Sequence, residues 1–114
     1  MRITTATLSH GEALRIDVAD DAWSRLRGLL GRDRLPAGEG LLLMGCASVH
    51  TCFMAFPVDV VYLDGDFRVT KTAERLQPWR FSFSRRGTRH TLELSAGAVE
   101  QHHLRVGDRL RVSP

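Results

Sequence analysis

The chain of 114 residues has no apolar run long enough to cross a membrane or to direct secretion. A membrane-spanning helix needs about 20 consecutive apolar residues, and the opening stretch MRITTATLSHG carries no apolar segment typical of a secretory signal. We therefore expect a soluble, cytoplasmic protein that makes no contact with a membrane.

Cysteine is nearly absent, and sequence motifs that mark enzymes are missing. Cys46 and Cys52 are the only two cysteines, too few for a disulfide framework, so we expect free thiols. There is no C-x-x-C pair of the kind found in structural zinc sites. There is also no glycine-rich phosphate loop, G-x-S-x-G elbow or H-E-x-x-H motif. These absences favour a non-enzymatic protein with no catalytic residues, no metal and no cofactor.

Lysine is represented by Lys71 alone, so the net charge of +3 and the pI near 9.5 come almost entirely from arginine. The guanidinium group binds carboxylates and phosphates through a planar fork, but a net charge of this size does not identify a partner. The apolar share of 43% and the charged share of 25% are ordinary for a soluble globular protein. A chain of this length suits one core, so we expect a single monomeric domain over residues 1–114.

Alternation of apolar and polar residues predicts many short strands. A hairpin is predicted from RITTATL and ALRIDVA, and another at Asp64-Gly65, where glycine accepts the positive φ of a tight primed turn. The remaining expected strands are GLLLM, VDVVYL, FSF, HTLELS and RLRV. Helices are expected over residues 20–31, capped by Asp20, and briefly within SAGAVEQHHL. The predicted fold is mainly β with an α+β tendency, a compact antiparallel β-sandwich or barrel-like domain with one or two short helices.

The segment GCASVHTCFMAFPVD, residues 45–59, gathers two cysteines, a histidine, a methionine and an aspartate. A metal site built on Cys46 and His50 and a nucleophilic thiol beside His50 are both conceivable, but the spacing matches no known ligand set or triad. Cysteine and methionine are also common core fillers. We therefore favour burial of the two thiols, Met54 and Phe56 at the entry to a central strand.

Three stretches resemble the family called domain of unknown function 192: RGLLGR with LPAGEGLLL, VHTCFMAFPVDVVYLDGDFRV, and HTLELSAGAVEQHHLRVGDRL. The match covers about residues 20–112, with the elements in the same order. The chain departs from the commoner pattern at His50-Thr51 and Phe53-Met54, where many members read F-W-M-K-N-T. We also expect it to lack the secretory leader that many members carry. The family's signature positions are Arg27, Gly28, Arg32, Gly40, Met54, Pro57, Asp59, Leu92, Glu93, Gly97, Gly107 and Asp108.

The resemblance implies a mainly β fold and brings no established activity. It also suggests partners for Asp59, because a carboxylate inside an apolar strand is costly unless it is paired. Arg27 and Arg32 are the partners that the family pattern implies. Together with His50 and Trp79, these three residues are our candidate ligand-binding set.

The segment from Arg75 to His90 interleaves arginines with aromatic residues, a pattern typical of surfaces that bind single-stranded nucleic acid. The strand alternation predicts that Phe81 and Phe83 point inward, which would leave only Trp79 to stack on a base. Trp79 would either plug the end of a barrel or lie exposed at a contact site, and we rank the plug first. His90 is expected to be a hydrogen-bonded core or rim residue, and His102 and His103 to decorate the exposed end of a short helix.

The leading hypothesis is thus a non-enzymatic domain that binds a small polar or anionic ligand, or a protein partner. One alternative is an enzyme that uses Cys46 or Cys52 with His50. Another is single-stranded nucleic-acid binding through residues 75–90, which we rank below a small anion because Phe81 and Phe83 are expected to point inward.

Overall fold

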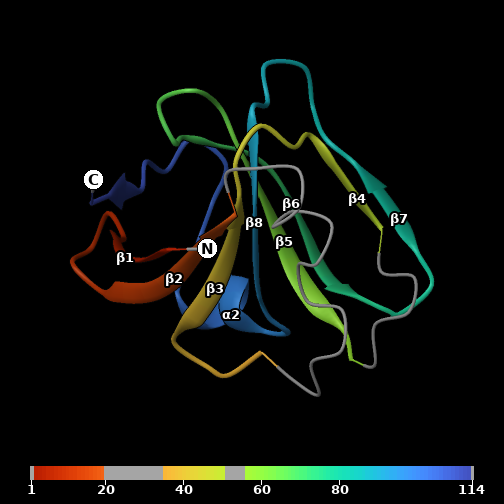
Figure 1. Ribbon diagram of the computed structural model, residues 1–114, viewed down its shortest axis with the longest axis horizontal. Helices are drawn as coiled ribbons and strands as arrows, with labels where there is room; N and C mark the ends of the chain where they lie inside the picture. Colours follow the sequence, from red (N-terminus) through yellow and green to blue (C-terminus); the bar gives the residue numbers. More distant parts are fainter. Residues whose placement is uncertain (1, 20–34, 51–55, 114) are drawn as a thin grey trace.

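The computed structural model describes residues 2–19, 35–50 and 56–113, which form a curled seven-stranded sheet and a separate two-stranded ribbon (Figure 1). The helix expected over residues 20–31 lies outside the described residues. The elements are β1 (Arg2–Thr7), β2 (Ala13–Ala19), β3 (Glu39–Leu43), β4 (Ser48–His50), β5 (Val58–Leu63), β6 (Val69–Leu76), β7 (Phe81–Phe83), β8 (His90–Ser95), α2 (Ala98–Gln101) and β9 (Arg111–Val112).

The large sheet has the order β6-β5-β8-β3-β2-β1-β9, and β4 pairs with β7 in the ribbon. In the large sheet, every pair of neighbouring strands is antiparallel except β2 and β3, which are parallel. The sheet curls so far that its two outermost ends meet. Arg68 and Arg109 form an isolated antiparallel bridge, and the N–H of Val69 donates to the carbonyl of Asp108 at 2.8 Å. The architecture is a half-barrel that closes at one end, which confirms the mainly β, barrel-like fold expected from the sequence.

The strands follow the hydrophobic pattern of the sequence closely. In β2 the alternating residues Leu14, Ile16 and Val18 are buried, as expected for a strand with one wet face. In β5 the whole run VDVVYL is buried, because this strand lies between β6 and β8 in a part of the sheet that is covered on both faces. β8 is also buried on both faces, so Thr91 and Glu93 are enclosed as well as Leu92 and Leu94.

Two apolar cores lie on opposite faces of the sheet. The first contains inward residues from strands at both ends of the sheet together with α2, and its members are Ala6, Leu8, Leu14, Ile16, Val18, Leu42, Val61, Leu63, Val69, Leu92, Leu94, Ala98, Val99, Leu104 and Leu110. The second core covers the other face of the central strands, and its members are Ala19, Leu35, Leu41, Leu43, Val58, Val60 and Tyr62, with Cys46, Phe56, Ala73 and Leu76 packed against them. Cys46 and Phe56 pack against this core but are only partly buried, so their expected role as core fillers is met in part. Cys52 and Met54 lie outside the described residues.

The hairpin between β5 and β6 is present, but its turn differs from the expected one. The loop runs from Asp64 to Arg68, whose backbone groups bond each other at 2.9 Å, and the residue with positive φ is Phe67, not Gly65. One carboxylate oxygen of Asp64 accepts the backbone N–H groups of Asp66 and Arg68, which stabilises this wider turn. Phe67 tolerates its left-handed conformation because its ring packs against the first core.

Candidate functional site

The candidate residue Asp59 is wholly buried, and it serves the fold directly. One carboxylate oxygen accepts the backbone N–H of Arg75 at 2.8 Å, and the other accepts the backbone N–H of Val99 at 2.8 Å. Arg27 and Arg32, its expected partners, lie outside the described residues, so that pairing stays a prediction. The two backbone donors stabilise the buried carboxylate in addition to any such pairing. A carboxylate enclosed in this way inside the half-barrel is not available to line an open ligand cleft.

The other members of the candidate set are only partly described. Arg27 and Arg32 lie outside the described residues, and of His50 only the backbone is described, at the end of β4 opposite Phe81. Trp79 leaves 55% of its surface exposed, so it is not the plug of a barrel that we ranked first. The structure therefore does not bring Asp59 and Trp79 together in one site.

Cys46 lies at the edge of the second core and forms no disulfide with a described residue. The nearby histidine whose contacts are described is His90. The backbone N–H of Gly45 donates to Nδ1 of His90 at 3.0 Å, and the imidazole stacks on Phe67 with ring centroids 5.2 Å apart. Burial lowers the pKa of His90, and the charge of Arg89 adds to this effect. His90 is thus the hydrogen-bonded rim histidine that the strand pattern predicted. The hypothesis of a Cys/His enzyme stays a prediction, since Cys52 and the side chain of His50 are not described.

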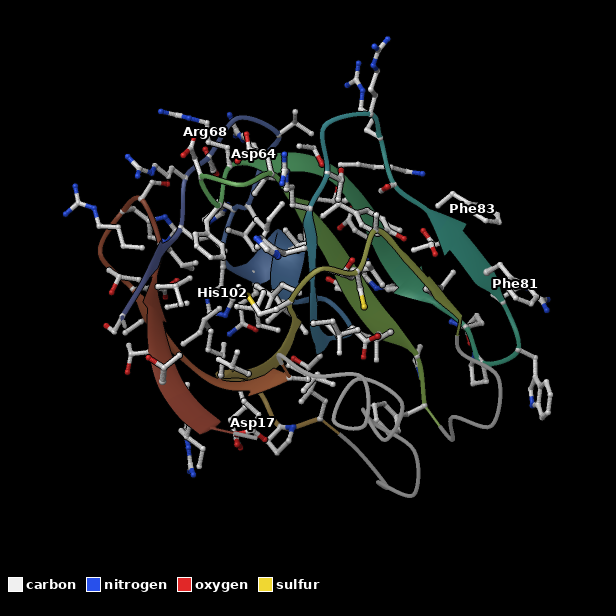
Figure 2. The ribbon with its side chains drawn as sticks, turned by 45° about the horizontal axis from the view of Figure 1, so that its top comes forward. Asp17, Asp64, Arg68, Phe81, Phe83 and His102 are labelled. Carbon is white, nitrogen blue, oxygen red and sulfur yellow. The ribbon has the colours of Figure 1, made fainter. Side chains whose placement is uncertain are left out.

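The most distinctive surface of the described structure lies on β7. Phe81 and Phe83 are 66% and 69% exposed, whereas Ser82 between them is buried (Figure 2). The expected orientation of this strand was therefore wrong. The alternation of two phenyl rings with one hydroxyl fits either face equally well, and here the small residue faces the sheet. Trp79 is exposed just before the same strand.

Arginines bracket these aromatic residues. Arg80 precedes β7 and Arg85 and Arg86 follow it, and all three are exposed. Neither Arg85 nor Arg86 takes part in an ion pair with another described residue. No aspartate or glutamate occurs between Arg75 and Thr91. We call the side chains of Trp79, Arg80, Phe81, Phe83, Arg85 and Arg86 the ribbon surface.

The ribbon is fastened to the sheet by the one lysine of the chain. Nζ of Lys71, on β6, donates to the carbonyl oxygen of Phe83 at 2.6 Å and lies 5.9 Å from the centre of the Tyr62 ring. The N–H of Ser84 donates to the carbonyl of Ala47 at 3.1 Å, which extends the pairing of β7 with β4. These contacts hold the backbone beneath Phe83 in place, so its ring is presented from a fixed position.

Beneath the ribbon, polar groups interrupt the second core. The Tyr62 hydroxyl is buried and makes no hydrogen bond with the described residues. Burial raises the pKa of Tyr62, the nearby hydroxyl of Ser82 opposes part of this rise, and the negative charge of Glu93 adds to it. The side chains of Tyr62 and Glu93 lie on the same side of β5 and β8, because Val60 pairs with Glu93 and Tyr62 pairs with Thr91. They form a buried layer.

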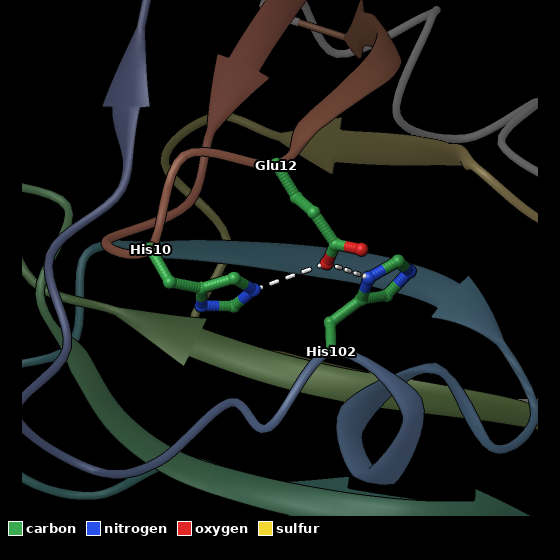
Figure 3. A network of polar contacts seen from close by, with 3 residues as sticks. All are labelled: His10, Glu12 and His102. Atoms are coloured by element: carbon green, nitrogen blue, oxygen red, sulfur yellow. Dashed lines mark hydrogen bonds and ion pairs between the residues drawn. The ribbon is translucent and has the colours of Figure 1, made fainter.

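A second polar cluster joins the turn between β1 and β2 to the end of α2 (Figure 3). One carboxylate oxygen of Glu12 accepts hydrogen bonds from Nδ1 of His102 at 2.6 Å and from Nε2 of His10 at 3.0 Å. These bonds, that of His102 first, lower the pKa of Glu12. His102 is buried in this contact, so it does not merely decorate an exposed helix end. Over residues 2–19, 35–50 and 56–113 no group of three His, Cys, Asp or Glu side chains is placed to hold a metal ion.

No helix in the described part of the chain is long and apolar enough to span a membrane.

Comparison with known proteins identifies relatives without a known function. The family described as DUF192, Uncharacterized ACR, matches residues 4–112. A UPF0127 protein of Pyrococcus furiosus is 32% identical over 108 residues, which cover 90% of this chain and 92% of that protein. A UPF0127 protein of Thermococcus sibiricus is 28% identical over 84% of this chain, which spans only 64% of that protein's length.

Among solved structures, a crystal structure from Sinorhizobium meliloti, described there as that of a candidate transcription regulator, has a TM-score of 0.88. The two chains share 24% sequence identity, and the match covers 97% of this chain and 94% of the chain from Sinorhizobium meliloti. At this level of identity the likeness concerns the fold alone.

Proposed function

The chain belongs to the DUF192 family of uncharacterised proteins, and on that premise we propose that it is a non-enzymatic binding domain whose ribbon surface contacts an anionic partner. The proposal replaces the cleft of Arg27, Arg32, His50 and Asp59 as the leading hypothesis, because Asp59 is enclosed. A small anion held by Arg27 and Arg32 stays a prediction.

The observation that supports the proposal most directly is the orientation of β7. Burying a phenylalanine side chain contributes about 2 kcal/mol to folding, and pairing β7 one residue out of register would turn Phe81 and Phe83 toward the sheet. The fold instead buries Ser82 and leaves both phenyl rings in solvent. Large apolar side chains gathered on a surface mark contact sites in soluble proteins.

Charge supports an anionic partner. The ribbon surface carries three arginines and no carboxylate, so its local field is positive, although the net charge of the whole chain is small. Arginine and tryptophan are also the residues that most often dominate the binding energy of protein interfaces. An acidic ligand would neutralise the guanidinium groups while it covers the aromatic rings.

Retention on a heparin column tests the proposal, because heparin is a sulfated polyanion. We expect the protein to elute at a salt concentration that falls clearly in the double variant Arg85→Ala/Arg86→Ala. Arg15→Ala/Arg111→Ala is the matched control, since it removes two exposed arginines from β2 and β9 and leaves the ribbon intact. Equal losses in both double variants, or no retention of the unchanged protein, would overturn the proposal.

A further inference from the structure

Resting on the function proposed above, we infer that the anionic partner is a single-stranded nucleic acid, two of whose bases stack on Phe81 and Phe83. The sequence favours a small anion over a nucleic acid as the ligand, because its strand pattern predicts that both phenyl rings point inward. They point outward, away from the sheet (Figure 2). The surface therefore offers two phenyl faces in addition to Trp79.

The spacing of the two phenyl rings selects unstacked bases. Residues two apart in a strand lie on the same face, with their Cα atoms about 6.6 Å apart. Successive bases in a duplex strand are separated by about 3.4 Å. Two neighbouring bases that each cover one of these rings must therefore be separated from one another, which a single strand permits and a duplex does not.

The arginines lie where the phosphates of such a strand would run. Arg80 comes directly before the first phenylalanine, and Arg85 and Arg86 come two and three residues after the second, so cations stand at both ends of the aromatic pair. Proteins that bind single strands without sequence preference combine such cationic tracks with aromatic platforms. The Lys71 contact to the Phe83 carbonyl holds the platform in place before binding, which reduces the entropy lost when a strand binds.

Two other occupants fit the surface less well. A second copy of the chain would bring its own arginines against Arg80, Arg85 and Arg86, and like charges at an interface oppose association. An acidic peptide would satisfy the guanidinium groups but supplies flat rings only where it carries aromatic residues. A nucleic acid supplies one phosphate and one planar base with every nucleotide, so it matches a surface of alternating arginines and aromatic rings more fully.

Fluorescence anisotropy with a labelled single strand of about 12 nucleotides tests the inference, since single-strand sites commonly span roughly 4–16 nucleotides. The informative pair of variants is Phe81→Leu/Phe83→Leu, which keeps apolar side chains but removes the aromatic faces, and Phe81→Tyr/Phe83→Tyr, which keeps them. We expect the leucine variant to bind at least about 30-fold more weakly, because the loss of each of the two base stacks weakens binding by at least about five-fold. The tyrosine variant should bind like the unchanged protein.

A duplex of the same sequence and polyglutamate of similar charge serve as competitors. We expect both to displace the labelled strand far less effectively than unlabelled single strand does. The inference is overturned if the leucine variant binds as tightly as the tyrosine variant, or if the duplex competes equally well. Retention on heparin that depends on Arg85 and Arg86, without binding of the single strand, would overturn this inference and leave the proposed function standing. Thermal unfolding of every variant shows that it is folded.

Discussion

The carboxylate of Asp59 accepts a hydrogen bond from the backbone N–H of Val99, a residue 40 positions later in the chain. Val99 is the second residue of α2, and the N-cap residue Gly97 has no side chain that could accept this bond. Asp59 thus supplies from β5 the acceptor that Ser, Thr or Asp normally provides at the N-cap itself. Its other oxygen binds the N–H of Arg75, at the point where β6 shifts register against β5.

We expect Asp59→Ala to lower the free energy of unfolding by about 3 kcal/mol or more. The variant leaves the buried N–H of Val99 and the part-buried N–H of Arg75 without the charged acceptor. Hydrogen bonds to charged groups contribute about 1.5–3 kcal/mol each. Urea unfolding followed by circular dichroism measures the loss. Asp66→Asn, which changes an exposed acid in the β5–β6 turn, is the control and should unfold like the original protein. A small loss for Asp59→Ala would show that water or another acceptor replaces the carboxylate.

Gly40 is needed because β3 passes very close to β8. A Cβ atom added at Gly40 would lie 2.7 Å from Cδ2 of Leu94 and 3.2 Å from the carbonyl oxygen of Glu93. Leu94 is fully buried and has little room to move. We expect Gly40→Ala to destabilise the fold by about 1–3 kcal/mol, the usual cost of overpacking a core. The control is Gly65→Ala, whose Cβ would meet no atom closer than 3.8 Å, and differential scanning calorimetry compares the two.

Much of the fold could be predicted from the sequence because its strands carry strong local patterns. The limits of β2 match the predicted stretch ALRIDVA, and the unbroken apolar run of β5 correctly indicated a strand covered on both faces. The parallel pairing of β2 with β3 was missed. Residues 20–34 of the connection between them lie outside the described residues.

The candidate site was harder to predict because it depends on tertiary contacts. No residue next to Asp59 in the sequence indicates that its carboxylate oxygens will accept the backbone N–H groups of Arg75 and Val99, since both donors come from distant elements. The orientation of β7 was ambiguous for another reason: Phe-Ser-Phe has the same period on either face. A signal that favours exposure was present in the sequence, namely the absence of any acid between Arg75 and Thr91 beside so many arginines.

The exposure of β7 predicts a double variant that leaves stability unchanged. We expect Phe81→Ser/Phe83→Ser to alter the free energy of unfolding by no more than about 1 kcal/mol, because exposed positions rarely contribute more than about 0.5 kcal/mol each. Leu92→Ala, a single truncation in the first core, should cost about 2–5 kcal/mol. Urea unfolding of the three proteins measures both effects. A large loss for the double variant would mean that the phenyl rings are packed in solution and would remove the basis of the ribbon surface.

Mild acid should weaken the fold through His90. Burial holds the pKa of its imidazole below the ordinary value of 6.5 in the folded protein, and the bond from Gly45 to Nδ1 requires that atom to be unprotonated. The unfolded chain therefore binds more protons than the folded chain at pH values just below 6.5. The contribution of His90 to stability is complete above pH 6.5 and is lost as the pH falls toward and through the folded pKa.

His90→Asn separates this effect from other titrations, because the amide oxygen of asparagine can still accept the N–H of Gly45 but does not titrate. We expect the melting temperature of the original protein to fall between pH 7.5 and pH 5.5 more steeply than that of the variant. Glu12, with its pKa lowered below 4.5 by His102 and His10, contributes above that value and loses its contribution only at lower pH, outside this window. Parallel pH curves for the two proteins would show that another group, not His90, governs stability in mild acid.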